Sequence, residues 1–248
     1  MKTIFLMLCT ALLCVNLYAQ EELKRKDGRT IIIDNDGTWR FKLSISKDSH
    51  DGKLYKTVKI GTQTWMVENL NVSRFRNGDQ IPEVKTDEEW TEAGKEGNPA
   101  WCYYDNNPEN GKKYGKLYNW YTVNDKRGLA PKGWHIPTNT ELQSLATIVG
   151  NDGSALKAIN QAGIGSLNPG TNTSGFSALL SGYRETLLMG VHENGLFMRI
   201  ESETHFLSST ENDSGSAFSI NLDNSSNNKI KQCAYQKGCG FSVRCVKN

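Results

Sequence analysis

Residues 133–150 decide the fold, and they read Gly133-Trp-His-Ile-Pro-Thr-Asn-Thr-Glu-Leu-Gln-Ser-Leu-Ala-Thr-Ile-Val-Gly150. Thr138 and Glu141 have the spacing of a capping box, in which a hydroxyl and a carboxylate satisfy free N–H groups at a helix start. Pro137 keeps the helix from starting earlier, and Gly150 stands where a left-handed residue ends a helix. Apolar residues recur between these ends at helical spacing, at Leu142, Leu145, Ala146 and Val149. The stretch therefore predicts an amphipathic helix with one buried face.

Two further helices are predicted upstream of this one. Thr86 and Glu89 repeat the capping-box spacing and begin a short helix that runs through Trp90 and Ala93. Residues 114–124 carry four residues at helical spacing, which are Leu117, Trp120, Tyr121 and Asn124. This spacing predicts an amphipathic helix with an aromatic face.

Short strands are predicted on both sides of these helices. Residues 55–60 and 65–67 read as two strands, because β-branched and aromatic side chains fit a pleated surface. After residue 170 the pattern becomes β-like, with predicted strands at 175–180, 195–200, 205–209, 218–222 and 241–245. An antiparallel meander packed on two main helices is an α+β fold, and this is the fold class that we expect.

The first fifty residues have a different organisation. Residues 27–43 read as a separate β-hairpin, in which the turn Asp34-Asn35-Asp36-Gly37 joins two runs rich in β-branched and aromatic residues. An isolated hairpin is marginally stable in water, so we expect it to dock on the main domain or on a partner. Residues 44–53 read as a polar linker. Together these segments predict an N-terminal unit over residues 20–52 and a main domain over residues 53–248.

Residues 1–19 have the pattern of a cleaved signal peptide. Lys2 precedes an apolar run from Ile4 to Val15, and Ala19 is a small residue suited to the cleavage site. The run is shorter than the roughly 20 apolar residues of a membrane-spanning helix, and no later run is long enough to span. We therefore expect a mature chain that starts at Gln20, has no transmembrane segment, and lies in the periplasm, on the cell surface or outside the cell.

The composition narrows the class of partner. The 248 residues include 29 Lys and Arg against 27 Asp and Glu, and no basic block stands out. A chain that binds nucleic acid or an anionic membrane usually shows a strong basic excess. We therefore expect neither as a partner.

The cysteines favour disulfide bonds. Two of the six cysteines, Cys9 and Cys14, lie in the signal peptide, which leaves Cys102, Cys233, Cys239 and Cys245. An even number in an exported chain is typical of disulfides, whereas a zinc site usually has close Cys-x-x-Cys pairs. Four cysteines allow three connectivities, and their spacing does not choose among them.

Six segments identify a resemblance to a known family. They occur in order at residues 55–70 (YKTVKIGTQTWMVENL), 114–121 (YGKLYNWY), 133–138 (GWHIPT), 175–178 (GFSA), 208–211 (SSTE) and 240–247 (GFSVRCVK). Together they resemble the Fibrobacter succinogenes major paralogous domain over about residues 53–248. The resemblance implies an exported, surface-associated domain abundant in Bacteroidetes and Fibrobacteres. It also implies a C-type-lectin-like fold related in shape to the formylglycine-generating enzymes, with Cys102 bonded to Cys245 and Cys233 therefore bonded to Cys239.

The residue pattern predicts that this chain is not an enzyme. Of its four histidines, His135 stands beside a helix cap, and His192 lacks the second histidine that a zinc protease helix has. No nucleophile elbow and no phosphate-binding loop occurs. The formylglycine-generating enzymes use reactive cysteines, whereas these cysteines read as structural.

Two sets of residues remain as candidates for ligand binding. Glu211, Asp213 and Asp223 are the weak candidates for a calcium site, because calcium takes hard oxygen ligands, although such residues are also common in turns. Tyr103 and Tyr104 could stack on sugar rings or join the core, whereas Trp120 and Tyr121 fit the core better. We expect a binding module for a glycan or a surface protein. The alternatives are a structural module without a ligand and, less favoured, an enzyme. No cofactor other than calcium is expected.

Overall fold

The helix predicted after Thr138 is present in the computed structural model as α4 (Asn139–Ile148). The Thr138 hydroxyl accepts from the Glu141 N–H at 3.2 Å, and the Glu141 carboxylate accepts from the Thr138 N–H at 2.8 Å. At the other end Gly150 has a φ of 69°, and its N–H donates to the Thr147 carbonyl at 3.0 Å. Both ends are therefore fixed by local sequence, as the capping box and the glycine predicted.

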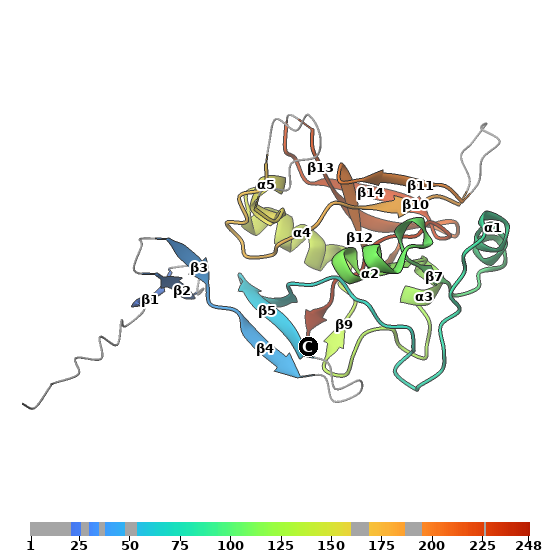
Figure 1. Ribbon diagram of the computed structural model, residues 1–248, viewed down its shortest axis with the longest axis horizontal. Coiled ribbons are helices and arrows are strands. Elements are labelled where there is room, and N and C mark those ends of the chain that lie inside the picture. Colours follow the sequence, from blue (N-terminus) through green and yellow to red (C-terminus); the bar gives the residue numbers. More distant parts are fainter. Residues whose placement is uncertain are drawn as a thin grey trace, which may run out of the picture.

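The structure describes residues 21–25, 30–34, 38–47, 54–159, 169–186, 195–225 and 227–248. In these residues the fold is mixed α+β (Figure 1). Its helical elements are α1 (Asp87–Glu96), the 3-10 turn η1 (Tyr104–Asn106), α2 (Pro108–Tyr114), α3 (Trp120–Val123), α4 and α5 (Gly153–Leu156). None of the described helices is long and apolar enough to cross a membrane.

Two five-stranded sheets form the main part of the molecule (Figure 1). The first has the order β11 (Phe197–Ile200), β10 (Ser181–Arg184), β12 (Glu203–Glu211), β13 (Ser216–Asp223), β14 (Lys231–Gln236). The second has the order β4 (Ser44–Lys47), β5 (Leu54–Ile60), β6 (Gln63–Met66), β15 (Val246–Lys247), β9 (Trp134–His135). Because β15 pairs with β6, the last strand of the chain lies in the same sheet as the first strands of the main domain.

One face of helix α4 packs against these two sheets. Leu142 and Leu145 are fully buried and belong to one hydrophobic cluster with Trp65 of β6, Phe206 of β12 and Ile220 of β13. Replacing a buried leucine with alanine typically costs about 2–5 kcal/mol, so this stripe contributes a large part of the stability. The predicted apolar face of the helix therefore holds the two sheets together.

The N-terminal hairpin is present and has gained a third strand. β2 (Thr30–Ile33) pairs with β3 (Trp39–Phe41) as predicted, and β1 (Glu21–Lys24) adds to the other side of β2. The hairpin docks on the main domain through Phe41. A Cβ placed on Gly175 would lie 2.8 Å from the Phe41 ring and 2.9 Å from a Val58 methyl, so only glycine allows this approach.

Part of the predicted polar linker is instead a strand. Residues 44–47 form β4, which pairs antiparallel with β5 at the edge of the second sheet. The Thr57 hydroxyl also donates to the Ser44 carbonyl at 3.1 Å. A polar edge strand needs little apolar surface, because one edge and one face can remain in water, and this explains why composition alone indicated a linker.

Two predicted strands differ from the structure, and one observed strand was not predicted. Residues 175–180 are not a strand, and only Ala178 makes an isolated bridge there, while β10 begins at the next residue, Ser181. Residues 240–242 make single bridges and the last strand, β15, begins at Val246. β14 was not predicted, because its burial is slight and its sequence shows no clear apolar alternation.

The predicted helix over residues 114–124 is wrong. Its first residue ends α2, residues 117–118 form strand β8 against β7 (Trp101–Cys102), and α3 is a single turn. Gly115, with a φ of 78°, ends α2. Asn119 then begins α3, because its side-chain oxygen accepts from the Thr122 N–H at 3.0 Å and from the Ala100 N–H at 3.1 Å. Trp120 is buried as expected and Tyr121 is half-buried, but tertiary contacts divide the aromatic residues of this range among three elements.

Candidate ligand-binding site

A groove lies between the N-terminal hairpin and the main domain. Its volume is about 850 Å³, and it is lined on the hairpin side by Ile32, Trp39 and Phe41. The opposite side includes Asn172 and Ile159. This volume is within the range of about 300–1,000 Å³ that is typical of small-molecule sites.

The hairpin side of the groove presents an exposed aromatic ring. Trp39 is 47% exposed and stands edge-on to Phe41, with the ring centroids 5.4 Å apart. Ile159 across the groove is 66% exposed. A tryptophan usually buries most of its area, so a half-exposed ring beside a groove is suited to contact a ligand.

The domain side of the groove is held in an unusual backbone conformation. Asn172 has a φ of 50° and Ser177 a φ of 58°, which non-glycine residues seldom adopt. The two side chains hold each other, because the Asn172 amide donates to the Ser177 hydroxyl at 2.7 Å and its oxygen accepts from the Ser177 N–H at 2.8 Å. The wall opposite Trp39 is therefore fixed by its own hydrogen bonds.

The tyrosines singled out from the sequence lie elsewhere. Tyr104 is 6% exposed and packs in the core against Phe197, with the ring centroids 5.2 Å apart. Tyr103 is half-buried, and its hydroxyl accepts from the Lys116 ammonium at 3.0 Å. That ammonium also lies 4.0 Å from the centre of the Trp101 ring. Neither tyrosine lines the groove, and the ring that does, Trp39, was interpreted only as part of a strand.

The three calcium candidates are not brought together. Glu211 and Asp213 stand before β13 and Asp223 stands at its end, so the eight residues of the strand separate them. Each carboxylate already has protein partners. Glu211 pairs with Lys237, and Asp223 pairs with Lys231 at 2.6 Å. Asp213 accepts from backbone N–H groups of its own turn. Within the described ranges, no group of three or more His, Cys, Asp or Glu side chains could hold a metal ion.

Among the described residues, Cys102, Cys233, Cys239 and Cys245 form no disulfide bond. Cys102, Cys239 and Cys245 are buried and Cys233 is partly buried. Burial raises the pKa of both Cys102 and Cys239 to about 12, which makes these thiols weak nucleophiles. Cys102 and Cys245 belong to different clusters of the core. The structure thus lends no support to the implied pairings, which stay predictions.

The described histidines have structural partners. His135 lies 2.8 Å from Glu141 of the capping box and 2.8 Å from the side chain of Asn248. His205 is fully buried, and its Nε2 lies 2.8 Å from a Glu203 oxygen. Burial lowers the pKa of His205, which favours the neutral ring. His50 and His192 lie outside the described residues.

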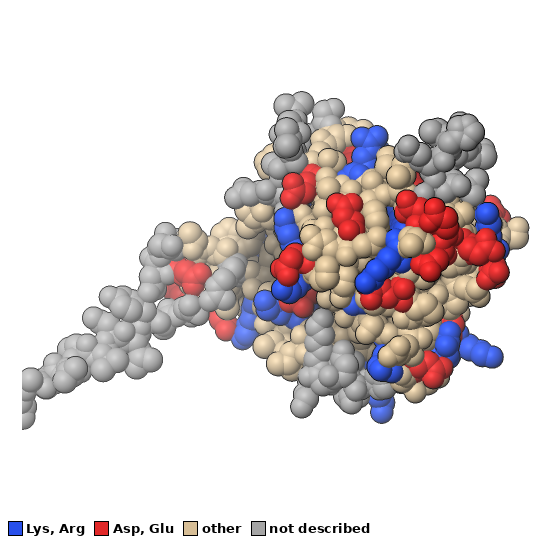
Figure 2. Space-filling view, turned by 45° about the vertical axis from the view of Figure 1, so that its right-hand side comes forward, with Lys and Arg blue, Asp and Glu red and all other residues tan. Residues whose placement is uncertain are grey.

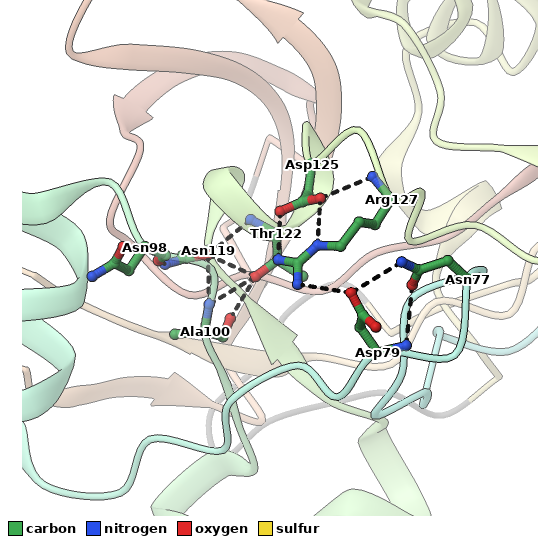
Figure 3. Close-up of polar contacts among 8 residues, drawn as sticks. All are labelled: Asn77, Asp79, Asn98, Ala100, Asn119, Thr122, Asp125 and Arg127. Carbon is green, nitrogen blue, oxygen red and sulfur yellow. Dashed lines mark hydrogen bonds and ion pairs between the residues drawn. The ribbon is translucent and has the colours of Figure 1, made fainter.

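Two groups of polar contacts support the loops that enclose the aromatic core (Figure 3). The Asn119 amide donates to the Asn98 carbonyl at 2.8 Å, which ties α3 to the segment after α1. Near it, Arg127 contacts Asp125 at 2.8 Å and Asp79 at 3.4 Å. The hydrogen bond from Arg127 lowers the pKa of Asp125. Because the bonds of Asn119 and Asp125 are internal, these contacts position loops.

The charged side chains are mixed over the surface. Figure 2 shows Lys and Arg interspersed with Asp and Glu on the visible face, and neither sign covers that face alone. Several of them form exposed pairs, such as Lys112 with Glu109 at 2.6 Å. Such pairs contribute roughly 0–1 kcal/mol each.

Comparisons with known proteins give a family but no characterised relative. No curated protein and no solved structure matched the chain. The Fibrobacter succinogenes major domain matches residues 58–247. That range begins in β5 and ends in β15, so it includes both five-stranded sheets except β4, together with all the described helices. The chain belongs to the Fibrobacter succinogenes major domain family.

Proposed function

We propose that the protein is an exported, surface-associated binding module that holds a neutral glycan in the groove beside Trp39. The observation that carries this proposal is the half-exposed Trp39 ring on a groove of about 850 Å³. The C–H face of a sugar stacks on such a ring, and the hydroxyls and amides of Thr171, Asn172 and Ser177 in the lining suit sugar hydroxyls. The proposal includes no catalytic step.

Export is part of the same proposal. The apolar run at the start of the chain supports it, and residues 1–20 lie outside the described structure. N-terminal sequencing of the protein from the producing cells should give Gln20. Retention of Met1 in the surface or secreted fraction would contradict cleavage.

We also propose that the domain has a C-type-lectin-like arrangement. The antiparallel pairing of most strands and the packing of one face of α4 against two sheets agree with such a layout. An experimental structure compared with lectin-like domains would test this arrangement, and a different strand connectivity would contradict it.

A glycan array tests the ligand, with and without calcium. We expect one class of neutral glycan to bind equally in both conditions, because the calcium candidates are separated and already paired. For the glycan that binds, Trp39→Ala should weaken the affinity at least tenfold by calorimetry. Ile45→Ala is the matched control, because Ile45 is 67% exposed but does not line the groove.

The experiment also separates the proposal from its main alternative. If no glycan binds, or if Trp39→Ala binds as tightly as the parent protein, the groove is not a glycan site. A structural module without a ligand would then be favoured. The exposed apolar side chains of Ile45 and Leu54, on paired strands at the sheet edge, would be its natural contact surface.

A further inference from the structure

Arg244 is a buried cation in the middle of the apolar core. It lies just before β15 and is 1% exposed. Its guanidinium carbon lies 4.2 Å from the centre of the Phe176 ring and 5.1 Å from that of Phe206. These rings stabilise a positive charge through their faces, but they do not neutralise it.

No carboxylate bonds to this guanidinium among the described residues. Nε and Nη2 donate to the Asn69 side-chain oxygen at 3.2 and 2.7 Å, and Nη1 donates to the Phe176 carbonyl. A guanidinium has five N–H groups, so two remain beyond these three bonds. The nearest acidic influence is Glu68, which instead approaches Lys56 at 3.9 Å.

Keeping an unpaired charge in the core is costly. Burial lowers the pKa of Arg244 to about 9, so the group is still charged at neutral pH. Buried charges in proteins are ordinarily paired with an opposite charge. A buried guanidinium is therefore expected to have an anion as its partner, and no carboxylate of the described residues bonds to Arg244.

A small pocket adjoins Arg244. Its volume is about 230 Å³, and Arg244 forms part of its wall with Asn71, Lys112 and Lys113. The lining contains three cations, Arg244, Lys112 and Lys113, and one acidic residue, Glu68, so positive charge prevails. Lys112 and Lys113 make ion pairs with glutamates that do not line the pocket. The pocket is thus small, polar and positively charged, with a buried guanidinium at its wall.

We infer that this pocket binds a small organic carboxylate. The carboxylate is planar and matches the N–H fork of a guanidinium, and its single charge equals the one that Arg244 leaves unneutralised. The pocket has room for a carboxylate together with part of the group that carries it, such as a sugar acid. This pocket shares Ser177 with the Trp39 groove, but Arg244, Lys112 and Lys113 line the pocket alone.

D-Galacturonate and D-galactose are the matched probes, because they differ at one carbon and in charge. In the purified, ¹⁵N-labelled protein, galacturonate should shift the Nε–H resonance of Arg244, and galactose should not. Acetate should produce a smaller shift at the same resonance. A high salt concentration should weaken the affinity for galacturonate, since added ions screen the attraction.

Three variants test whether the carboxylate binds in the pocket beside Arg244. Arg244→Met should lower the affinity at least tenfold. Leu179→Trp should do the same without touching the charge, because Leu179 is half-buried in the pocket lining and the larger ring would fill the space. Lys85→Ala, which removes an exposed lysine elsewhere, should bind as the parent does. Equal binding of galactose and galacturonate, or unchanged galacturonate affinity in folded Leu179→Trp, would overturn the inference.

Discussion

Among the described residues, two arginines are almost wholly buried, and they are held in different ways. Arg184 is 0% exposed and Arg244 is 1% exposed. Each guanidinium lies between two aromatic rings, and those of Arg184 belong to Trp90 at 4.8 Å and Phe197 at 4.7 Å. The setting of the two cations is therefore alike, and their polar partners make the difference.

Arg184 has acceptors for four of its five N–H groups, and one of these acceptors is a carboxylate. Its guanidinium donates to the carbonyls of Gly195, Val84 and Lys85 at 2.8–2.9 Å and to the Asp87 carboxylate at 2.9 Å. Arg184 thereby ties β10 to the segment that leads into α1. The guanidinium of Arg244 donates to two acceptors, which are the side-chain oxygen of Asn69 and the carbonyl of Phe176. The comparison indicates that Arg184 is a structural clamp and that Arg244 keeps donors free for a ligand.

The largest effect is expected from removing the clamp. Arg184→Met should lower the free energy of unfolding by about 3 kcal/mol, because it leaves three backbone carbonyls without their donor inside the protein. Urea unfolding followed by tryptophan fluorescence would measure this loss. Lys112→Met is the control, since the Lys112 side chain is 74% exposed and the loss of its ion pair with Glu109 should cost less than about 1 kcal/mol. Equal losses in the two variants would show that Arg184 is not a clamp.

Local sequence predicted the parts of the fold whose interactions are local. The capping box of Thr138 and Glu141 and the glycine at 150 are read from neighbouring residues, and α4 has both. The helix predicted over residues 114–124 is wrong for the opposite reason. Their aromatic spacing suits a helix, but Asn119 bonds to Ala100 and Asn98, which lie about twenty residues away.

The candidate sites were harder to predict for the same physical reason. The hairpin that carries Trp39 was predicted, whereas the opposite wall at Asn172 and Ser177 comes from a segment more than a hundred residues later. In the sequence, Arg244 stood out only as one residue of the segment at 240–247 that resembles the family. Its burial depends on Asn69 and Phe176, which come from distant segments, and no pattern in a single sequence reports such a meeting.

A smaller effect is expected at the second arginine. Arg244→Met should lower the free energy of unfolding by only about 1 kcal/mol, because it removes an unneutralised charge along with its hydrogen bonds. Replacing a buried charge with an apolar side chain of similar size is often nearly neutral. The same urea titration measures it. A loss as large as that of Arg184→Met would mean that the two arginines have the same structural role.

The smallest effect is expected at the carboxylate that distinguishes the two sites. Asp87→Asn should lower the free energy of unfolding by about 0.5 kcal/mol, since the amide oxygen can still accept from Arg184 and only the charge is lost. The Asp87 side chain is 48% exposed, so water already screens its attraction to Arg184. As the first residue of α1, Asp87 also interacts favourably with the helix dipole, by a similarly small amount. Urea unfolding of Asp87→Asn and of Arg184→Met would separate the contribution of the Asp87 charge to stability from that of the Arg184 hydrogen bonds. If Asp87→Asn loses as much stability as Arg184→Met, the ion pair with Asp87 accounts for the stabilising effect of Arg184. The absence of such a pair at Arg244 is then the more important difference between the two arginines.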